Sequence, residues 1–181
     1  VYDHLKNAIR FSMERLGAHD MPAGLHADWN DCLRMGAKGE STFVAFQLYY
    51  AMSVIRDMAQ QRGDSEYVAY IDDVQAKLGA SLEKCWDEDR FIRGIREDGV
   101  VVGAKKDPEA SMWLNPQSWA VISGFASKDQ AEQSMESVHR ILNTPYGIKL
   151  LDPPYRAHYF DGALMHIFNP DTKENGGIFS Q

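Results

Sequence analysis

Residues 40–61, Glu-Ser-Thr-Phe-Val-Ala-Phe-Gln-Leu-Tyr-Tyr-Ala-Met-Ser-Val-Ile-Arg-Asp-Met-Ala-Gln-Gln, carry the strongest helical pattern in the chain. Apolar side chains recur every three or four positions, which places them on one broad face of a helix. They are Phe43, Phe46, Leu48, Tyr49, Met52, Ile55 and Met58. Gly63 follows and ends the helix, because glycine readily adopts the left-handed conformation found after a helix. The stretch predicts a long amphipathic helix.

Four further segments with helical spacing flank this helix. Their expected ranges are 5–16, 65–85, 115–124 and 127–142. Gly17 ends the first segment, and Asp64 or Ser65 caps the second. Ser127 and Gln130 form a capping-box pattern at the start of the last. Short links join most of these segments, so we expect an array of helical hairpins.

Two regions break the helical pattern. Residues 91–96 alternate between apolar and polar side chains, 97–99 have turn composition, and 100–102 are all valine, which together predict a short β-hairpin. The stretch 19–39 is expected to be a loop, and 150–181, rich in Pro, Asp, Gly and aromatic residues, a loop with one short strand.

These elements predict a mainly α fold. The helical segments share no sequence repeat that aligns, which argues against a regular solenoid. Loops of this length in a compact domain usually have a function. Long functional loops at one end of a helical barrel would explain the layout best.

The composition is that of one globular domain. The 181 residues are enough for a sizeable core, and the hydrophobic (44%) and charged (25%) fractions are ordinary. A net charge of -7 argues against a nucleic-acid partner. No apolar run is long enough to span a membrane, and the first residues lack a signal-peptide pattern. Only Cys32 and Cys85 are present, so no disulfide framework is expected and the cytoplasm is the expected compartment.

The two ends of the sequence do not resemble natural termini. The chain begins at Val1 inside a helical pattern and stops at Gln181 after an apolar run. We therefore expect a segment of a longer polypeptide, cut at both ends.

The chemistry is concentrated in residues 24–33, Gly-Leu-His-Ala-Asp-Trp-Asn-Asp-Cys-Leu, which we call the motif loop. An indole stands between two carboxylates here, and sugar-processing enzymes use this mixture. The aromatic face packs on a pyranose ring while a carboxyl group transfers a proton at the glycosidic oxygen. The alternative is a polar loop in which Asp28 or Asp31 caps a helix and Trp29 is a packing residue.

Three other segments combine aromatic and polar side chains. They are 113–119, 152–161 and 173–181. For 113–119 we favour packing at a helix start over ligand contact, and for 152–161 each residue taken singly favours a solvated loop. In 173–181, Gly176 and Gly177 would allow the backbone to approach a ligand closely.

Other chemistries fit the residues less well. The six histidines show no metal-ligand spacing; they are His4, His19, His26, His139, His158 and His166. Residues 28–31 do not continue into a calcium loop. No phosphate-binding glycine loop, dinucleotide fingerprint or Gly-x-Ser-x-Gly motif occurs. Nothing indicates an activated thiol at Cys32, which we expect to be a small buried side chain. No metal and no cofactor are predicted.

Several blocks of sequence together resemble glycoside hydrolase family 94. The blocks are Gly-Leu-His-Ala-Asp-Trp-Asn-Asp-Cys-Leu (24–33), Gly-Glu-Ser (39–41), Asn-Pro-Gln-Ser-Trp-Ala-Val-Ile-Ser-Gly (115–124), Asp-Pro-Pro-Tyr (152–155) and Lys-Glu-Asn-Gly-Gly-Ile-Phe-Ser (173–180). They occur in the family's order over nearly the whole chain. The family includes the cellobiose, cellodextrin, chitobiose and laminaribiose phosphorylases.

The resemblance implies that residues 1–181 are a segment of a single catalytic (α/α)6 barrel. It implies that Asp31 is the general acid and that Trp29 lines the sugar site. It places His26 and Lys173 near the acceptor subsite. Where the family has a histidine that helps to bind phosphate, this chain has Gln181, which can donate a hydrogen bond but cannot become cationic.

The implied reaction is inverting phosphorolysis. Phosphate is already an anionic nucleophile, so one carboxyl group is enough, whereas an inverting hydrolase needs a second carboxylate to activate water. Asp31 would protonate the glycosidic oxygen while phosphate attacks the anomeric carbon, giving α-glucose 1-phosphate and a free sugar. Asp28 could favour the protonated form of Asp31 or could hold the loop as a hydrogen-bond acceptor, and we favour the second role.

Other functions remain open at this stage. The substrate is expected to be cellobiose, with laminaribiose, chitobiose or cellobionic acid as alternatives. An inverting hydrolase on the same barrel would need Asp161 or Glu174 as its base, and a non-catalytic sugar-binding module would not need the complete motif. The expected partners are a small carbohydrate and inorganic phosphate, with a homodimer as the full-length assembly. An isolated segment could not close a barrel, and its exposed apolar faces would favour association.

Overall fold

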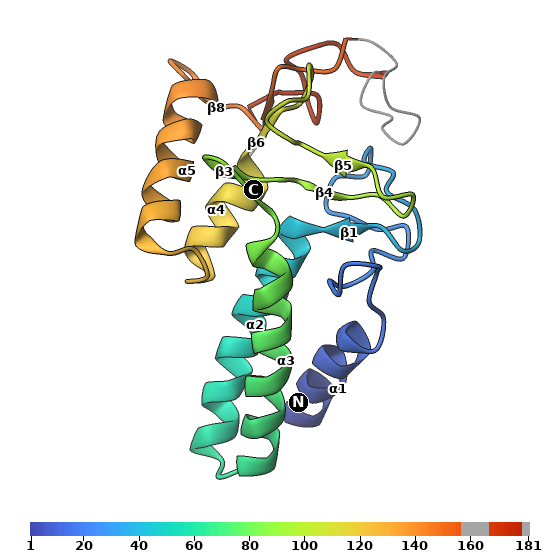
Figure 1. The fold of residues 1–181 in the computed structure, drawn as a ribbon, viewed down its shortest axis with the longest axis vertical. Helices are drawn as coiled ribbons and strands as arrows, with labels where there is room; N and C mark the ends of the chain where they lie inside the picture. The colour runs from blue at the N-terminus through green and yellow to red at the C-terminus, as the bar shows by residue number, and fades with distance from the viewer. Residues whose placement is uncertain (157–166, 179–181) are drawn as a thin grey trace.

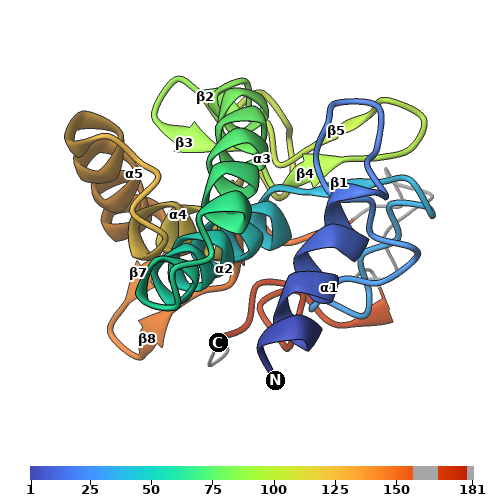
Figure 2. The same cartoon turned by 90° about the horizontal axis from the view of Figure 1, so that it is seen from below.

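The computed structural model describes residues 1–156 and 167–178, and the helices dominate it. They are α1 (Tyr2–Met13), α2 (Thr42–Gln61), α3 (Ser65–Glu83), α4 (Leu114–Ile122) and α5 (Lys128–Ile141). The long helices α2 and α3 run side by side, with α1 on one side of this pair and α4 and α5 on the other (Figures 1 and 2). The prediction of a mainly α fold is confirmed.

The α2–α3 hairpin forms because both of its apolar faces are covered and its ends are capped. Phe46 and Met52 from α2 lie against Ile71 and Leu78 from α3 in one fully buried cluster. Each such side chain contributes roughly 1.5–3 kcal/mol by leaving water. At the connection, the Asp64 carboxylate accepts the Tyr67 N–H (3.2 Å), as expected for the N-cap, and Gly63 adopts the predicted left-handed conformation (φ +71°).

The predicted hairpin is present and gains a third strand. β4 (Gly94–Ile95) and β5 (Val101–Val102) are antiparallel, with Gly99 in the left-handed turn (φ +83°) between them. β1 (Glu40–Ser41) pairs with the other edge of β4, giving the order β1-β4-β5. The expectation that the helix starts at Glu40 is therefore wrong by two residues. Ser41 is instead its N-cap, since its hydroxyl accepts the Val44 N–H (3.4 Å).

The other strands are two residues long and form antiparallel pairs. They are β2 (Trp86–Asp87) with β3 (Arg90–Phe91), β6 (Met112–Trp113) with β9 (Leu151–Asp152), and β7 (Asn143–Thr144) with β8 (Gly147–Ile148). β9 is the one short strand expected after residue 150. Its pairing with β6 brings the last part of the chain beside the start of α4.

Further helix boundaries differ from the prediction by one to three residues. α1 ends at Met13 and not at Leu16, because Leu16 forms a β-bridge with Pro22 as the chain reverses there. α4 begins at Leu114, with Trp113 as its N-cap residue. The capping box of α5 is as predicted: the Gln130 N–H donates to the Ser127 hydroxyl (3.2 Å), and the Ser127 N–H donates to the Gln130 side chain (3.0 Å).

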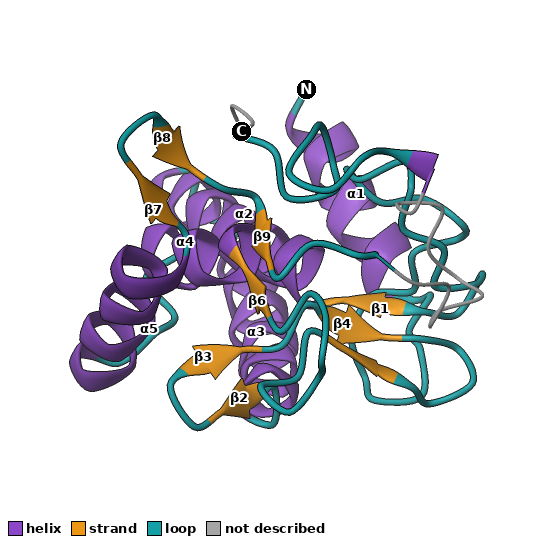
Figure 3. Ribbon diagram, turned by 90° about the horizontal axis from the view of Figure 1, so that it is seen from above, coloured by secondary structure: helices purple, strands orange, loops and turns teal. Residues whose placement is uncertain are grey.

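The strands and long connections lie together at one end of the helices (Figures 1 and 3). This arrangement is consistent with part of a helical barrel, and the closed barrel stays a prediction. In the described part of the chain no helix is long and apolar enough to span a membrane.

Asp89, in the β2–β3 turn, joins this end of the fold to α5. Its carboxylate accepts hydrogen bonds from Arg90 (2.9 Å), from the Ser137 hydroxyl (2.9 Å) and from Arg140 (3.1 Å), and Lys105 lies 3.4 Å away. Burial opposes ionisation, but the hydrogen bonds from Arg90 and Ser137 and the charges of Arg90 and Lys105 outweigh it and lower the pKa of Asp89 to about 2.

Asp89 should therefore make folding stability depend on pH in the acid range. A lowered pKa in the folded state stabilises the fold fully above pH 4 and loses its contribution as the pH falls towards 2. The contribution is about 2 kcal/mol. In urea titrations, the free energy of unfolding of Asp89→Asn should be lower than that of the wild type at pH 6, and the two should be similar at pH 2. Asp73→Asn, which removes an exposed pair with Lys77, is the matched control and should change little at any pH.

Candidate active site

The motif loop is anchored at its start by backbone hydrogen bonds to the end of the same connection. The Gly24 N–H donates to the Gly39 carbonyl (2.8 Å) and the Leu25 N–H to the Ala37 carbonyl (2.9 Å). Leu25 and His26 then both adopt left-handed backbone conformations, with φ of +51° and +66°. Such conformations cost about 1–3 kcal/mol and cluster at functional sites. The exposed His26 is thus presented on a strained turn.

Asp28 and Asn30 hold the following residues from inside the fold. The Asp28 side chain is 1% exposed and forms an ion pair with Arg93, whose side chain is 0% exposed. The same carboxylate accepts the Asn30 N–H (3.0 Å), and the Asn30 amide oxygen accepts the Cys32 N–H (3.0 Å). The structural role that we favoured for Asp28 is therefore what the structure shows. Asp31, between two buried residues, is exposed.

Trp29 is both a packing residue and a surface residue. Its ring makes an edge contact with Phe43 at the start of α2 (centroids 6.5 Å apart), yet the residue remains 38% exposed. Asp28 and Trp29 line an open hollow of about 280 Å³ together with Phe11 of α1 and Val44 of α2. Asp31 is not among the residues that line this hollow.

Residues 167–178, which we call the C-terminal loop, are held by Asn175. This residue is 0% exposed. Its amide oxygen accepts the Tyr155 N–H (2.7 Å), and its amide nitrogen donates to the carbonyls of Tyr155 (2.9 Å) and Phe168 (3.1 Å). A Cβ on Gly177 would lie 2.5 Å from the Lys173 backbone nitrogen, so only glycine allows this tight turn.

The motif loop and the C-terminal loop pack on one hydrophobic cluster. The cluster contains Cys32, Leu33, Met35, Val102, Ala110, Trp113, Leu151 and Tyr155, with Phe168 against it. Residues from both loops therefore share one apolar floor.

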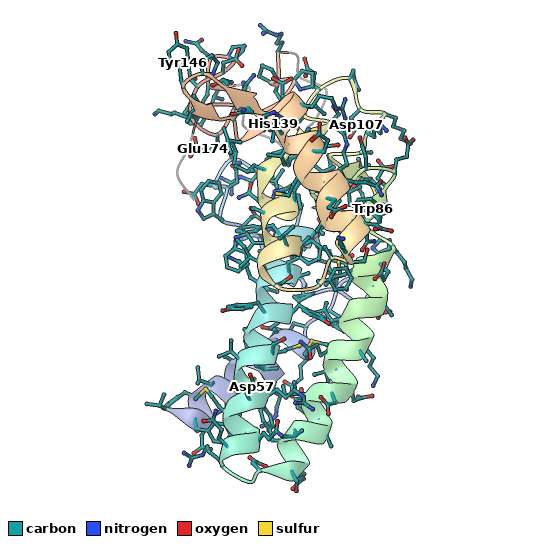
Figure 4. The ribbon with its side chains drawn as sticks, turned by 90° about the vertical axis from the view of Figure 1, so that its left-hand side faces the viewer. Asp57, Trp86, Asp107, His139, Tyr146 and Glu174 are labelled. Carbon is teal, nitrogen blue, oxygen red and sulfur yellow. The ribbon has the colours of Figure 1, made fainter. Side chains whose placement is uncertain are left out.

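Charged groups from both loops surround Cys32. Burial raises the pKa of the Cys32 thiol, and the charges of Glu174 and Asp31 raise it further, whereas Arg34 and Lys173 lower it. Asp31, Lys173 and Glu174 are therefore all close enough to Cys32 for their charges to act on its thiol. One oxygen of Glu174 is buried with no hydrogen-bond partner among the described residues. In Figure 4 Glu174 lies at the end of the molecule opposite Asp57 of α2.

The structure thus brings together some of the predicted site residues. Asp31 and Lys173 share one neighbourhood, while Trp29 points to Phe43 and His26 is exposed at the turn. Gln181 and Asp161 lie outside the described residues.

The block that starts α4 is a packing element, as we favoured. The Gln117 side chain accepts the Phe91 N–H and donates to the Phe91 carbonyl, both at 2.8 Å. Trp113 is buried and donates from its indole nitrogen to the Ala110 carbonyl (2.8 Å).

The sequence pattern does not single out Arg93 and Glu40, which are both buried. Arg93 stands in that pattern as one polar member of an alternating strand. Glu40 was assigned to a helix, yet its carboxylate accepts the N–H groups of His19 and Met21 (both 3.0 Å) and contacts the His19 ring (2.6 Å). Glu40 thereby fixes the chain just before the motif loop. The available signal for Arg93 was its place between apolar neighbours in Phe91-Ile92-Arg93-Gly94-Ile95.

Comparison with known proteins identifies the family. The profile of the glycosyl hydrolase 94 superfamily, catalytic domain, matches residues 1–181. The chain belongs to this superfamily. It is 36% identical to the N,N'-diacetylchitobiose phosphorylase of Vibrio furnissii, over 99% of this chain and 23% of that protein. It is 35% identical to the cellobionic acid phosphorylase of Neurospora crassa, over 84% of this chain and 20% of that protein. This family-94 chain thus spans about a quarter of the length of the first of these relatives and about a fifth of the second.

A solved structure supports the fold of the family-94 segment. The rhamnosidase of family GH78 from Bacillus sp. GL1 superposes on 82% of this chain and 15% of its own, with a TM-score of 0.63 and 16% identity. At this identity the likeness concerns the fold alone. Within residues 1–156 and 167–178, no three His, Cys, Asp or Glu side chains are grouped as metal ligands.

Asn175 should be among the most sensitive polar residues of the site. Asn175→Ala would leave buried backbone groups of Tyr155 and Phe168 without partners, and each such group costs about 1–3 kcal/mol. We expect the free energy of unfolding to fall by about 2–4 kcal/mol in urea titrations. Asn143→Ala is the matched control, because this exposed residue makes one 3.3 Å contact with His139. Equal effects of the two substitutions would contradict the structural role of Asn175.

Proposed function

We propose that the protein to which this segment belongs catalyses the inverting phosphorolysis of a β-linked disaccharide, with Asp31 as the general acid. One observation carries the proposal. Asp31 is the exposed carboxylate of a loop in which the neighbouring polar side chains, those of Asp28 and Asn30, are buried and hydrogen-bonded. Lys173 and Glu174 lie in the same neighbourhood. The family and its named phosphorylase relatives support the reaction class.

The proposed mechanism needs one carboxyl group from this loop. Protonated Asp31 donates to the glycosidic oxygen as that bond breaks, and phosphate attacks the anomeric carbon from the opposite face. The products are α-glucose 1-phosphate and a free sugar. Trp29 offers a partly exposed ring on which a sugar can pack. Lys173 and Glu174 offer charged donors and acceptors for hydroxyl groups.

Other assignments belong to the same proposal. His26, exposed at the strained turn, would contact the acceptor sugar, and Gln181 would contribute to phosphate binding. Inorganic phosphate is a co-substrate, and no cofactor takes part. The full-length protein is proposed to be a cytoplasmic homodimer.

Sequence identity does not select the disaccharide. Relatives at 36% and 35% identity are named for two different substrates, N,N'-diacetylchitobiose and cellobionic acid. We propose a cellobiose-type substrate first, with laminaribiose, chitobiose and cellobionic acid as alternatives.

The competing function is inverting hydrolysis with Glu174 as the base. The observation that favours it is the buried oxygen of Glu174 that has no hydrogen-bond partner among the described residues, on a carboxylate whose charge, like that of Asp31, acts on Cys32. A base that activates water would be needed only by a hydrolase. Phosphate dependence separates the two reactions.

The test measures release of the sugar 1-phosphate and of the free sugars by the full-length protein from the four disaccharides, with and without inorganic phosphate. Asp31→Asn cannot donate a proton and should lower kcat/KM by about 10²- to 10⁴-fold. Asp98→Asn, in the exposed turn of the β4–β5 hairpin, is the control and should keep wild-type activity. Cleavage at the same rate without phosphate would contradict phosphorolysis and indicate hydrolysis. The Glu174→Gln variant should then be inactive.

A further inference from the structure

Arg93 connects the motif loop to the scaffold. Its backbone N–H donates to the Val102 carbonyl (2.8 Å) on β5, and its carbonyl accepts the Thr42 N–H (3.1 Å) at the start of α2. Its side chain extends from these backbone contacts towards the motif loop. Nη1 donates to the Ser41 hydroxyl (2.6 Å), and Nη2 donates to Asp28 in the motif loop. One residue therefore contacts the sheet, the helix start and the loop.

The guanidinium lies in an aromatic cage. Its central carbon is 5.5 Å from the centroid of the Phe43 ring and 5.3 Å from that of Trp113. Gly103 keeps the cage open, because a Cβ there would lie 2.8 Å from the Trp113 ring and 3.0 Å from the Arg93 Cβ. The cage removes the charge from water, and a buried cation is tolerated only beside an anion. Asp28 is the anion that the cage requires.

We propose that Arg93 is a positioning residue of the reaction, acting through Asp28 on the placement of Asp31. The inference rests on the proposed function. Asp28 is three residues before Asp31, and its carboxylate also holds the Asn30 N–H that directly precedes the acid. Misplacing a catalytic group by about 1 Å can lower a rate about 10²-fold. Loss of the Arg93 cation would leave the Asp28 carboxylate buried without a counter-charge, and the loop would move so that this carboxylate reaches water.

Arginine is needed here for its shape as well as its charge. Its planar group contacts Ser41 and Asp28 with two different nitrogens while lying between two rings. The lysine ammonium is a single point charge on a flexible chain, so it can neutralise Asp28 but cannot reproduce the fork. Arg93→Lys should therefore restore part of what Arg93→Met loses.

The first test is independent of activity and uses the two thiols of the chain. Cys32 directly follows Asp31 and is 7% exposed, whereas Cys85 is 1% exposed in the separate cluster of α2 and α3. Burial raises the pKa of both thiols, that of Cys85 to about 11, so both should react slowly with iodoacetamide at pH 7.5. Peptide mass spectrometry measures the labelling rate of each cysteine in the full-length protein.

In Arg93→Met the labelling of Cys32 should rise by about tenfold or more, while Cys85 stays within about twofold of the wild type. Arg93→Lys should give an intermediate rate at Cys32. An equal rise at both cysteines would mean general loss of the fold and would overturn the proposal in favour of a structural role. An unchanged rate at Cys32 would overturn it as well.

The second test compares kcat with KM for phosphorolysis. Arg93→Met should lower kcat about 10²-fold with less than about threefold change in KM, and Arg93→Lys should recover part of the loss. Adding Asp28→Asn to Arg93→Met should lower kcat little further, because both act through one pair. Full additivity, or an unchanged kcat, would contradict the positioning role. If the wild type shows no phosphate-dependent cleavage, the proposed function fails, and the Cys32 labelling still decides whether Arg93 holds the loop.

Discussion

A guanidinium removed from water must have an anion beside it, and this requirement determines where the motif loop lies. Arg93 is held by the sheet and by the start of α2, so its position follows from the scaffold. Asp28 must meet it, since separating the two would leave a buried charge, which costs more than the hydrogen bond contributes. Trp29, Asn30 and Asp31 then have little freedom. The scaffold thereby fixes the position of a loop that has few regular hydrogen bonds of its own.

The helices could be predicted because their determinants are local. The apolar spacing of α2 and α3, the Asp64 cap and the Ser127 capping box all involve residues within a few positions of each other. The wrong start of α2 depends on distant partners. Residues 40 and 41 form a strand because Gly94 and Ile95 lie opposite them. No window along the sequence contains that information.

The same division applies to the site. The motif and the resemblance singled out Asp31 and Lys173, and the structure brings the two loops that carry them onto one cluster. The residues that hold those loops were not assigned, because each acts across the chain: Arg93 on Asp28, and Asn175 on Tyr155. A polar residue within an apolar strand indicates only that its side chain is buried. Which carboxylate neutralises it is a property of the folded chain.

The two-residue strands have a consequence for the order in which parts of the molecule open. The α2–α3 hairpin joins residues close in sequence, whereas β6 with β9 and β1 with β4 each close a long loop for very few hydrogen bonds. We therefore expect local opening to begin at these strand pairs, while the helices remain folded. Helical content alone is then a poor measure of an intact catalytic region. A sample can retain its far-ultraviolet signal while Asp31 and its neighbours are already apart.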